Sequence, residues 1–493
     1  MAKATLNLGN KIRSGTQWTL AGSLINEIVH FAVSIVLARL LLPEDFGLVA
    51  TVGVLTGLAG YFAGAGTGQA LVRAKHVEQR HFNVVFTLQL LISSGIYLTF
   101  VVLAPFFAAF FEQAIYQALL LVSGLNFFLR PFANIPNSRL QREMRFRPIV
   151  LINAITLVAS SAVSIGMALT GNGVWSLVIG GLSGALLRAI LLNLHARQGY
   201  ALVWDSDIIR EMGGYGVKVA TNSLIEHFRG QSLILILSKL TGPADVGLYN
   251  RASSLAAMPM RLVGTSPYQA VFRALAAEQD NLDKSRYIYY RTITLVAVYT
   301  LPLYVLAWWL AEPGIRFIYG DKWLASAEPL AILATTGLFR CIGNPSGAVI
   351  EARNRISAEI KLNIIAWLIL IAGVVYGLQW GLIGVAWASV ITSAFFNTGL
   401  AIVAERELKG APVALARAIS PALLLSTLLL ATIWAADTFF LSRYTQNSPG
   451  LYALFITAIG GTAYVAAFLL LPIASLRTES TKWRNKLGLP KPT

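Results

Sequence analysis

The stretch Leu37-Ala-Arg-Leu-Leu-Leu-Pro-Glu-Asp-Phe-Gly-Leu48 ends the first long apolar run of this chain. It recurs at an offset of 200 residues as Leu237-Ser-Lys-Leu-Thr-Gly-Pro-Ala-Asp-Val-Gly-Leu248. The same register extends in both directions, with about 17 identities in roughly 57 positions, which indicates an internal repeat rather than a shared turn motif. Because Pro and Gly punctuate both copies, each copy predicts a tight turn between two helices.

The composition indicates that the chain lies in a lipid bilayer. Hydrophobic residues make up 56% of it and charged residues 13%, and the mean hydropathy is +0.64. Fourteen apolar runs are centred near residues 28, 57, 95, 124, 159, 184, 230, 260, 300, 338, 369, 392, 425 and 461. A run of about 20 residues can cross roughly 30 Å of hydrocarbon as a helix. We therefore expect an all-α integral membrane protein with 14 transmembrane helices.

The net charge of +16 does not indicate nucleic acid, because the basic residues are scattered between apolar runs rather than gathered on one solvated surface. Alternate connections carry Lys and Arg, whereas the turns at Pro43 and Pro243 carry none. This pattern predicts that both termini are cytoplasmic. The loops with Arg316 and Arg443 break it. No small-residue cleavage site follows the first run, so we expect that run to remain as a helix.

The repeat predicts the arrangement of the helices. Six crossings separate the two copies, so both enter the membrane from the same side and form parallel repeats about an axis normal to the membrane. We expect a first six-helix lobe at 1–200, a second at 201–408, and two further helices with a basic tail at 409–493. Two such lobes around a central cleft favour a carrier that works by alternating access. The alternative is a duplicated membrane scaffold without transport activity.

Polar residues form a stripe along the first predicted helix. Ser23, Glu27, His30 and Ser34 are spaced by four, three and four residues and so share one face. Charged groups at such depth are costly unless they pair or face water, so we expect them to line the cleft. Glu27 and His30 are candidates for coupling transport to a proton gradient, although a local hydrogen bond between them would explain them equally well.

A corresponding stripe follows the seventh predicted helix. Lys218, Asn222, Glu226 and Arg229 share one face, and Arg261 lies near the middle of the next helix. The cationic excess predicts an anionic substrate bound by Arg229, Arg261, Lys218 and Asn222, with the two guanidinium groups better suited to phosphate than the lysine. Glu226 is a further candidate for coupling. Alternatively, Glu226 and Arg229 simply neutralise each other within the helix.

Five other basic residues lie near predicted helix ends. Arg39 and Lys239 should extend to the outer interface. Arg251 lies near the same boundary and lines either the cleft or the interface. Arg130 and Arg340 are expected toward the cytoplasmic ends of their helices, where they would reach the interface or lipid headgroups.

No catalytic or cofactor motif occurs in the sequence. A Walker A motif is absent, and Gly64-Ala-Gly66-Thr-Gly68 lacks the strand-to-helix context of a dinucleotide site. No His and Cys residues show metal-ligand spacing. The single cysteine, Cys341, permits no intramolecular disulfide. We therefore expect neither an enzyme nor a cofactor.

Four motifs carry a resemblance to a known family. They are Leu37-Ala-Arg-Leu-Leu-Leu-Pro-Glu-Asp-Phe-Gly47, Pro136-Asn-Ser-Arg-Leu-Gln-Arg-Glu-Met-Arg-Phe146, Gly173-Val-Trp-Ser-Leu-Val-Ile-Gly180, and Gly320-Asp-Lys-Trp323 before Pro329-Leu-Ala-Ile-Leu333. In this order on a chain with fourteen apolar runs, they resemble the polysaccharide transporter family, the Wzx-type flippases of the multidrug, oligosaccharidyl-lipid and polysaccharide exporter superfamily, with the colanic-acid type nearest.

The resemblance implies a flippase that moves an undecaprenyl-diphosphate-linked oligosaccharide across the bacterial inner membrane, without ATP hydrolysis, for exopolysaccharide or lipopolysaccharide biosynthesis. It also implies membrane lipids, a polysaccharide polymerase and chain-length proteins as partners. Two alternatives stay open: a drug exporter of the same superfamily, and a membrane-embedded polymerase or ligase acting on the same lipid-linked sugars. No motif of the resemblance assigns a role to Arg229 or Arg261.

Overall fold

A computed structural model describes residues 25–64, 67–74, 76–196, 199–210, 227, 230–263, 265–278, 280–441 and 448–489. Every regular element in these ranges is a helix. The chain divides into two compact units, Met1–Gly247 and Leu248–Thr493. Glu226, Arg229, Lys218 and Asn222 lie outside the described residues. The division at residue 200 and the two-lobe arrangement stay predictions.

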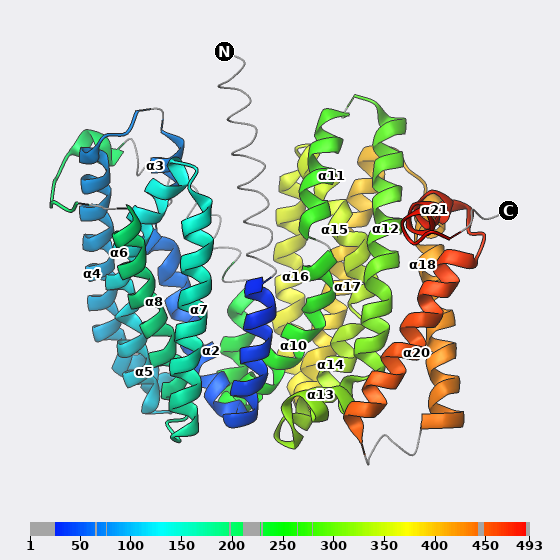
Figure 1. The fold of residues 1–493 in the computed structure, drawn as a ribbon, viewed down its shortest axis with the longest axis horizontal. Coiled ribbons are helices and arrows are strands. Elements are labelled where there is room, and N and C mark those ends of the chain that lie inside the picture. Colours follow the sequence, from blue (N-terminus) through cyan, green and yellow to red (C-terminus); the bar gives the residue numbers. More distant parts are fainter. Residues whose placement is uncertain are drawn as a thin grey trace. The chain divides into compact units, whose positions relative to one another are not determined.

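The first unit is a bundle of long helices that run side by side (Figure 1). It contains a helix at 25–40, α2 (Pro43–Gly64), α3 (Thr67–Arg73), α4 (Gln79–Phe110), α5 (Ile115–Gly124), α6 (Asn126–Arg142), α7 (Phe146–Leu169), α8 (Val174–Ala196) and a helix at Gly230–Leu240. One of its core clusters is rich in aromatic residues, with Phe100, Phe107, Tyr116 and Phe127 buried between α2, α4, α5 and α6. Close aromatic packing of this kind fixes the α4 to α6 hairpin.

The second unit is also a helix bundle (Figure 1). Its helices are α10 (Pro243–Val263, whose first turn belongs to the first unit), α11 (Thr265–Ala277), α12 (Leu282–Trp309), α13 (Ala311–Tyr319), η1 (Asp321–Ser326), α14 (Ala327–Ala334), α15 (Gly337–Ala352), α16 (Ile356–Gly377), η2 (Leu378–Trp380), α17 (Gly381–Leu408), α18 (Pro412–Ala436), η3 (Asp437–Leu441), α20 (Pro449–Leu470), η4 (Ala474–Leu476) and α21 (Arg477–Lys486).

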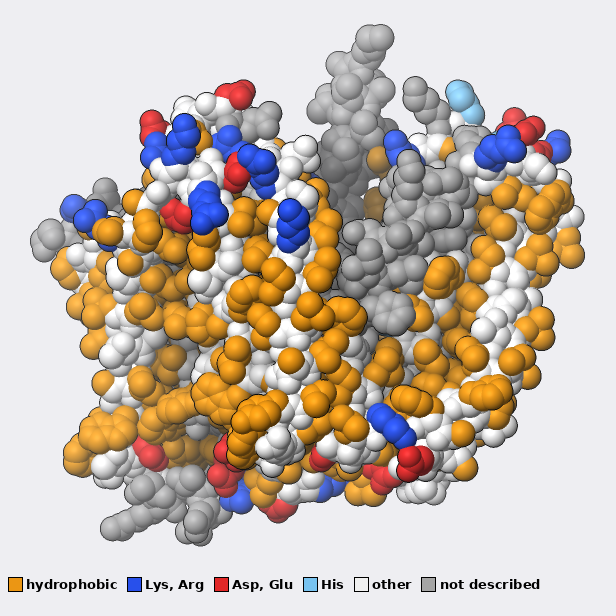
Figure 2. Space-filling model, turned by 180° about the vertical axis from the view of Figure 1, so that it is seen from behind, with side chains coloured by type: hydrophobic (Ala, Val, Ile, Leu, Met, Phe, Trp, Pro, Cys, Tyr) orange, Lys and Arg blue, Asp and Glu red, His pale blue; other side chains and the backbone are white. Residues whose placement is uncertain are grey.

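Nine helices among the described residues are long and apolar enough to cross a membrane. One of the nine, Ile356–Leu408, covers both α16 and α17 and so two of the predicted runs. On the face shown in Figure 2, apolar side chains cover the middle of each unit and charged side chains gather toward its ends. This distribution is typical of a multi-pass membrane protein. The count of fourteen spans stays a prediction.

Both copies of the opening motif form the expected turn. Pro43 is the first residue of α2 and Pro243 is the first of α10, the position where a missing N–H costs nothing. The Leu42 N–H donates to the Asp45 carboxylate at 2.9 Å, so Asp45 satisfies a backbone group at the helix start. Asp45 is thus bonded within its own turn, which supports its interpretation as a turn residue.

The two turns also pack directly on each other within the first unit. A Cβ atom added at Gly47 would lie 1.6 Å from the Pro243 carbonyl oxygen, and one added at Gly247 would lie 1.9 Å from the Pro43 carbonyl oxygen. Only glycine allows the two backbones to approach this closely. The repeated glycines are therefore contact residues as well as turn residues.

Candidate functional site in the first unit

A polar cavity lies among α2, α5, α6 and α8. Its volume is about 280 Å³. Its polar side chains are Thr56 from α2, Ser123 from α5, and Asn126 and Arg130 from α6. Gly53, Gly57 and Gly181 also line it, and their lack of side chains leaves the space open. The helices that form it are membrane-spanning candidates, so these polar groups lie within the membrane-spanning part of the unit.

A second polar cavity, of about 390 Å³, lies between the helix at 25–40, α7 and α8. Its polar side chains are Asn26, His30, Asn153, Thr156, Ser160 and Arg188. Gly181 of α8 lines both cavities, and a Cβ atom added there would meet nothing within 4 Å. The two cavities therefore adjoin at Gly181, and Arg130 lines one of them while Arg188 lines the other.

Arg130 is held by backbone and aromatic contacts rather than by an acid. Its Nη1 atom donates to the Gly60 carbonyl oxygen at 3.2 Å, and its guanidinium carbon lies 4.7 Å from the centre of the Phe127 ring. A Cβ atom at Gly60 would be 2.7 Å from Nη1, so glycine at this position admits the arginine. The expectation that Arg130 reaches the interface or lipid headgroups stays a prediction, and these contacts place its side chain beside the cavity.

Arg188 is less satisfied than Arg130. Its Nε atom is buried and has no hydrogen-bond partner within the described part of the chain. No ion pair links Arg188 or Arg130 to an acidic side chain among the described residues. Two guanidinium groups with free donor capacity thus face one polar region.

Both arginines lie deep in their helices. At 1.5 Å per residue, Arg130 is about 18 Å from the Arg142 end of its span and Arg188 about 12 Å from the Ala196 end of its own. Hydrocarbon is about 30 Å thick, so neither charge reaches the membrane surface by position alone. A charge at this depth persists only where it faces water or a counter-ion. The region is therefore suited to an anion, and to phosphate in particular because guanidinium binds it in a bidentate fork.

Of the residues predicted for coupling, the structure places two. His30 lines the second cavity with Arg188, whereas Glu27 is exposed on the same helix and does not line it. His227 lies beside α2, with its Nε2 atom 2.9 Å from the Val54 carbonyl oxygen and its ring edge-on to Tyr61. His30 therefore lines the same cavity as Arg188, an arrangement that the sequence did not reveal.

Arg261 is the one predicted substrate-binding residue among the described residues. It is exposed in the last turn of α10, and its Nη2 atom donates to the Ser254 carbonyl oxygen at 3.1 Å. Its predicted partner, Arg229, lies outside the described residues. The clamp of Arg229 and Arg261 stays a prediction.

Two of the basic residues expected near the outer boundary make specific contacts. The Arg251 guanidinium lies 4.9 Å from the Tyr319 ring centre and 5.2 Å from the Trp323 ring centre. Lys239 pairs with Glu112 at 2.6 Å. Cation and ring contacts of this kind stabilise the fold, and they give Arg251 a structural role.

Sequence reasoning missed Arg188 as a functional candidate. The available signal was a single arginine inside the apolar run centred near residue 184, because an isolated charge in a membrane span is a functional hypothesis by default. Spacing along one helix could not show that this arginine shares a cavity with His30, which is distant in sequence.

A comparison with protein families finds a match to the model of a family described as "Polysaccharide biosynthesis protein" over residues 36–328. This is more than half of the chain. The chain belongs to this family. The resemblance drawn from the four motifs is thereby confirmed at the level of the family.

Individual members of known sequence are distant but extensive matches. The lipopolysaccharide biosynthesis protein WzxC of Escherichia coli K12 is 22% identical over 383 residues, covering 77% of this chain and 78% of WzxC. The succinoglycan biosynthesis transport protein ExoT of Rhizobium meliloti is 25% identical over 308 residues, 62% of each chain. Both relatives are named for polysaccharide biosynthesis, and ExoT is named as a transport protein.

Two solved structures share the fold. The lipid II flippase MurJ, in an inward closed conformation, superimposes with a TM-score of 0.72 at 17% identity over 96% of this chain and 99% of MurJ. An inward-facing multidrug resistance transporter of the MATE family gives a TM-score of 0.61 at 15% identity, over 78% of this chain and 94% of that chain. At these identities the likeness shows a common transporter fold and leaves the cargo open.

Proposed function

We propose that this family member is a flippase that moves an undecaprenyl-diphosphate-linked oligosaccharide across the bacterial inner membrane by alternating access. The pathway served would be exopolysaccharide or lipopolysaccharide biosynthesis, with both termini in the cytoplasm. The observation that carries the proposal is the region of Arg130 and Arg188, two guanidinium groups within membrane spans that have no acidic partner among the described residues.

The chemistry of the region matches the head of such a substrate. A diphosphate can accept paired hydrogen bonds from the guanidinium groups of Arg130 and Arg188. The hydroxyl and amide groups of Ser123, Asn126 and Asn153 can bond sugar hydroxyls. The polyprenyl chain would stay in the surrounding lipid, so only the polar head has to enter the protein.

Further residues complete the proposal. Arg229, Arg261, Lys218 and Asn222 would bind the diphosphate from the second stripe. Glu27, His30 and Glu226 would take up and release protons during the cycle, because a carboxylate or imidazole in a membrane span can change its charge state with access to either side. Polymerase and chain-length proteins would receive the exported repeat unit.

The proposal is tested with Arg130→Gln and Arg188→Gln. Loss of one hydrogen bond to a charged group is worth about 1.5–3 kcal/mol, so each variant should lower transport of the lipid-linked oligosaccharide into proteoliposomes about tenfold or more. Arg188→Lys keeps the charge but loses the forked guanidinium, so its transport rate should lie between those of wild type and Arg188→Gln. Arg145→Gln is the matched control, because Arg145 is exposed and pairs with Glu143 at 3.3 Å.

If the double variant Arg130→Gln with Arg188→Gln is expressed normally and transports at the wild-type rate, these residues do not bind the substrate, and the diphosphate site proposed here is refuted. For coupling, Glu27→Gln should weaken the response of transport to a proton gradient and to ionophores. An unchanged response removes Glu27 from the mechanism.

The two arginine-lined cavities also argue against a cationic drug as the cargo. Two unpaired guanidinium groups repel a cation at short range, and the membrane interior screens that repulsion poorly. Sensitivity of a deletion strain to cationic drugs, with normal polysaccharide export, would reverse this assignment.

A further inference from the structure

The last helix of the chain is fixed to the second unit. Figure 1 shows α21 nearly end-on while α12 and α18 are seen along their length, so α21 lies crosswise to these helices. Leu476, at its start, is 1% exposed and packs in a core cluster with Val296 of α12 and Ile419 of α18. Arg484 is buried, and its Nη1 atom donates to the Leu469 carbonyl oxygen at 3.0 Å.

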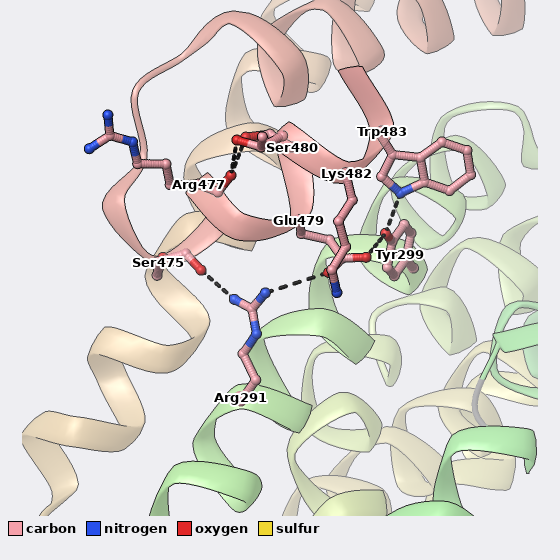
Figure 3. Close-up of polar contacts among 9 residues, drawn as sticks. Arg291, Tyr299, Ser475, Arg477, Glu479, Ser480, Lys482 and Trp483 are labelled. Atoms are coloured by element: carbon pink, nitrogen blue, oxygen red, sulfur yellow. Dashed lines mark hydrogen bonds and ion pairs between the residues drawn. The ribbon is translucent and has the colours of Figure 1, made fainter. Parts of the chain in front are cut away.

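Polar contacts add to this attachment. Figure 3 shows Glu479 of α21 between Arg291 and Tyr299 of α12. Arg291 lies 3.6 Å from the Glu479 carboxylate and also donates to the Ser475 carbonyl oxygen. The Tyr299 hydroxyl donates to Glu479 at 3.4 Å and accepts from the Trp483 indole N–H at 2.9 Å. These contacts place η4 and α21 firmly beside α12.

Where α21 attaches, a cavity forms that is not part of the transport site proposed above. Its volume is about 450 Å³, and it lies between α12, α18, η4 and α21. Its lining consists of Tyr287, Tyr290, Arg291, Thr294, Ala414, Arg417, Ala418, Ala474, Ser475 and Thr478. The lining thus contains two arginines and no acidic side chain.

Arg417 is the cation that this cavity leaves available. It is exposed near the start of α18, and its side chain makes no hydrogen bond or ion pair with any described residue. Two acids lie nearby: Glu479 is already shared by Arg291 and Lys482, at 3.6 and 3.4 Å, and Glu405 accepts a hydrogen bond from the Tyr290 hydroxyl at 2.8 Å. The hydroxyl groups of Ser475 and Thr478 border the same space. An anion entering the cavity would therefore meet an unpaired guanidinium and hydroxyl donors.

One of the two arginines of the cavity, Arg417, lies near the start of a candidate membrane span. Arg417 is about 7.5 Å from the first residue of α18 along the helix axis. Tyr287, at the rim, is 69% exposed, as expected for an aromatic residue at a membrane interface. Arginines at this depth attract anionic headgroups.

An apolar surface continues from Arg417 along α18. Leu424 and Leu428 are 51% and 40% exposed, and they follow Arg417 at helical spacings that keep them on the same face. Free phosphate would gain nothing from this surface, whereas an acyl chain would bury part of it. The combination of a charged cavity and an adjoining apolar face fits an amphiphile.

We propose that this cavity, with Arg417 and Arg291 as its cations, binds the phosphate of an anionic phospholipid whose acyl chain lies along Leu424 and Leu428. The proposal is independent of the transport function, because it concerns a resident lipid at a different place in the chain. Failure of the Arg130 and Arg188 tests would leave it unchanged.

The test is native mass spectrometry of the full chain in detergent, with phosphatidylglycerol, phosphatidylcholine or inorganic phosphate as the added probe. Arg417→Gln should weaken binding of the first phosphatidylglycerol about tenfold, because a charged hydrogen bond is lost. Arg417→Lys should recover most of the binding. The matched control is Arg477→Gln. Arg477 belongs to α21, which borders the cavity, but its side chain points away from the contacts drawn in Figure 3.

Wild-type protein should prefer phosphatidylglycerol over phosphatidylcholine, and inorganic phosphate should not displace the lipid. Three results would overturn the proposal: equal binding of the two lipids, equal losses in Arg417→Gln and Arg477→Gln, or displacement by inorganic phosphate. Displacement would reassign the cavity to a soluble phosphate. The melting temperature of each variant shows that it is folded, so a lost lipid is not mistaken for a lost protein.

Discussion

Substitution of Gly47 by alanine is the sharpest test of the packing between the two copies of the repeat motif. The new Cβ atom would lie 1.6 Å from the Pro243 carbonyl oxygen, 2.5 Å from its carbonyl carbon and 3.0 Å from the Gly247 nitrogen. Ordinary contact begins at 3.4 Å. The obstacle is backbone at both positions, so no side chain can rotate away. The two turns would have to separate by about 1.8 Å, the difference between the two distances.

Such a separation would disturb a buried hydrogen-bond network one turn along α2. The Thr51 hydroxyl lies 3.0 Å from the Ser238 hydroxyl, which in turn lies 3.0 Å from the Tyr116 hydroxyl. All three residues are buried, at 0%, 4% and 0% exposure. If the two segments move apart, these hydroxyls lose partners in a place that water does not reach.

The magnitude follows from three contributions. Overpacking costs about 1–3 kcal/mol, and a buried hydroxyl left without a partner costs about 1–3 kcal/mol. Alanine gains about 1 kcal/mol over glycine as a helix former, which offsets part of this. The net loss is about 1–5 kcal/mol, a large share of the roughly 5–15 kcal/mol that stabilises a typical domain.

The measurement is the apparent melting temperature of the purified protein in detergent. Gly47→Ala should lower it by roughly 5–15 °C, and Gly247→Ala should do the same because its Cβ atom would meet the Pro43 carbonyl oxygen at 1.9 Å. The control is Gly95→Ala in α4, where a Cβ atom meets nothing within 4 Å. If Gly47→Ala has the same apparent melting temperature as Gly95→Ala, the close packing of the two turns is refuted.

Two further predictions concern groups outside the cavities. The backbone N–H of Ile208, with that of Asp207 and the Arg80 guanidinium, holds the pKa of Asp205 below its usual range. The stability that this carboxylate contributes is therefore present above its ordinary pKa of about 4 and is lost as pH falls through the lower folded value; melting curves of wild type and Asp205→Asn should differ near neutral pH and converge in acid. Arg251→Lys should lower the melting temperature, because it keeps the charge but loses planar stacking on the aromatic rings, worth about 0.5–2 kcal/mol; an unchanged melting temperature would show that the stacking contributes nothing.

The sequence and the structure agree best where a property is local. The Pro and Asp residues of the opening turn act on their own helix start, and their roles could be predicted from spacing alone. The predictions were poorest for Arg130 and Arg188. Whether an arginine extends to the interface or lines a cavity depends on neighbouring helices, and Arg130 is held by Gly60 and Phe127, residues of which only Phe127 is near in sequence.

By itself the sequence determined that this chain is a helical membrane protein, because apolar run length and turn residues are local properties that the bilayer selects directly. The family was indicated separately, by the four motifs, and the family match confirmed it. Tertiary structure alone decided which polar groups share a cavity. Arg188 of α8 and His30 of the helix at 25–40 line the same cavity, and Gly47 contacts Pro243, which lies about two hundred residues later in the sequence. These contacts depend on how helices pack, and helix packing is set by side chains of both partners at once.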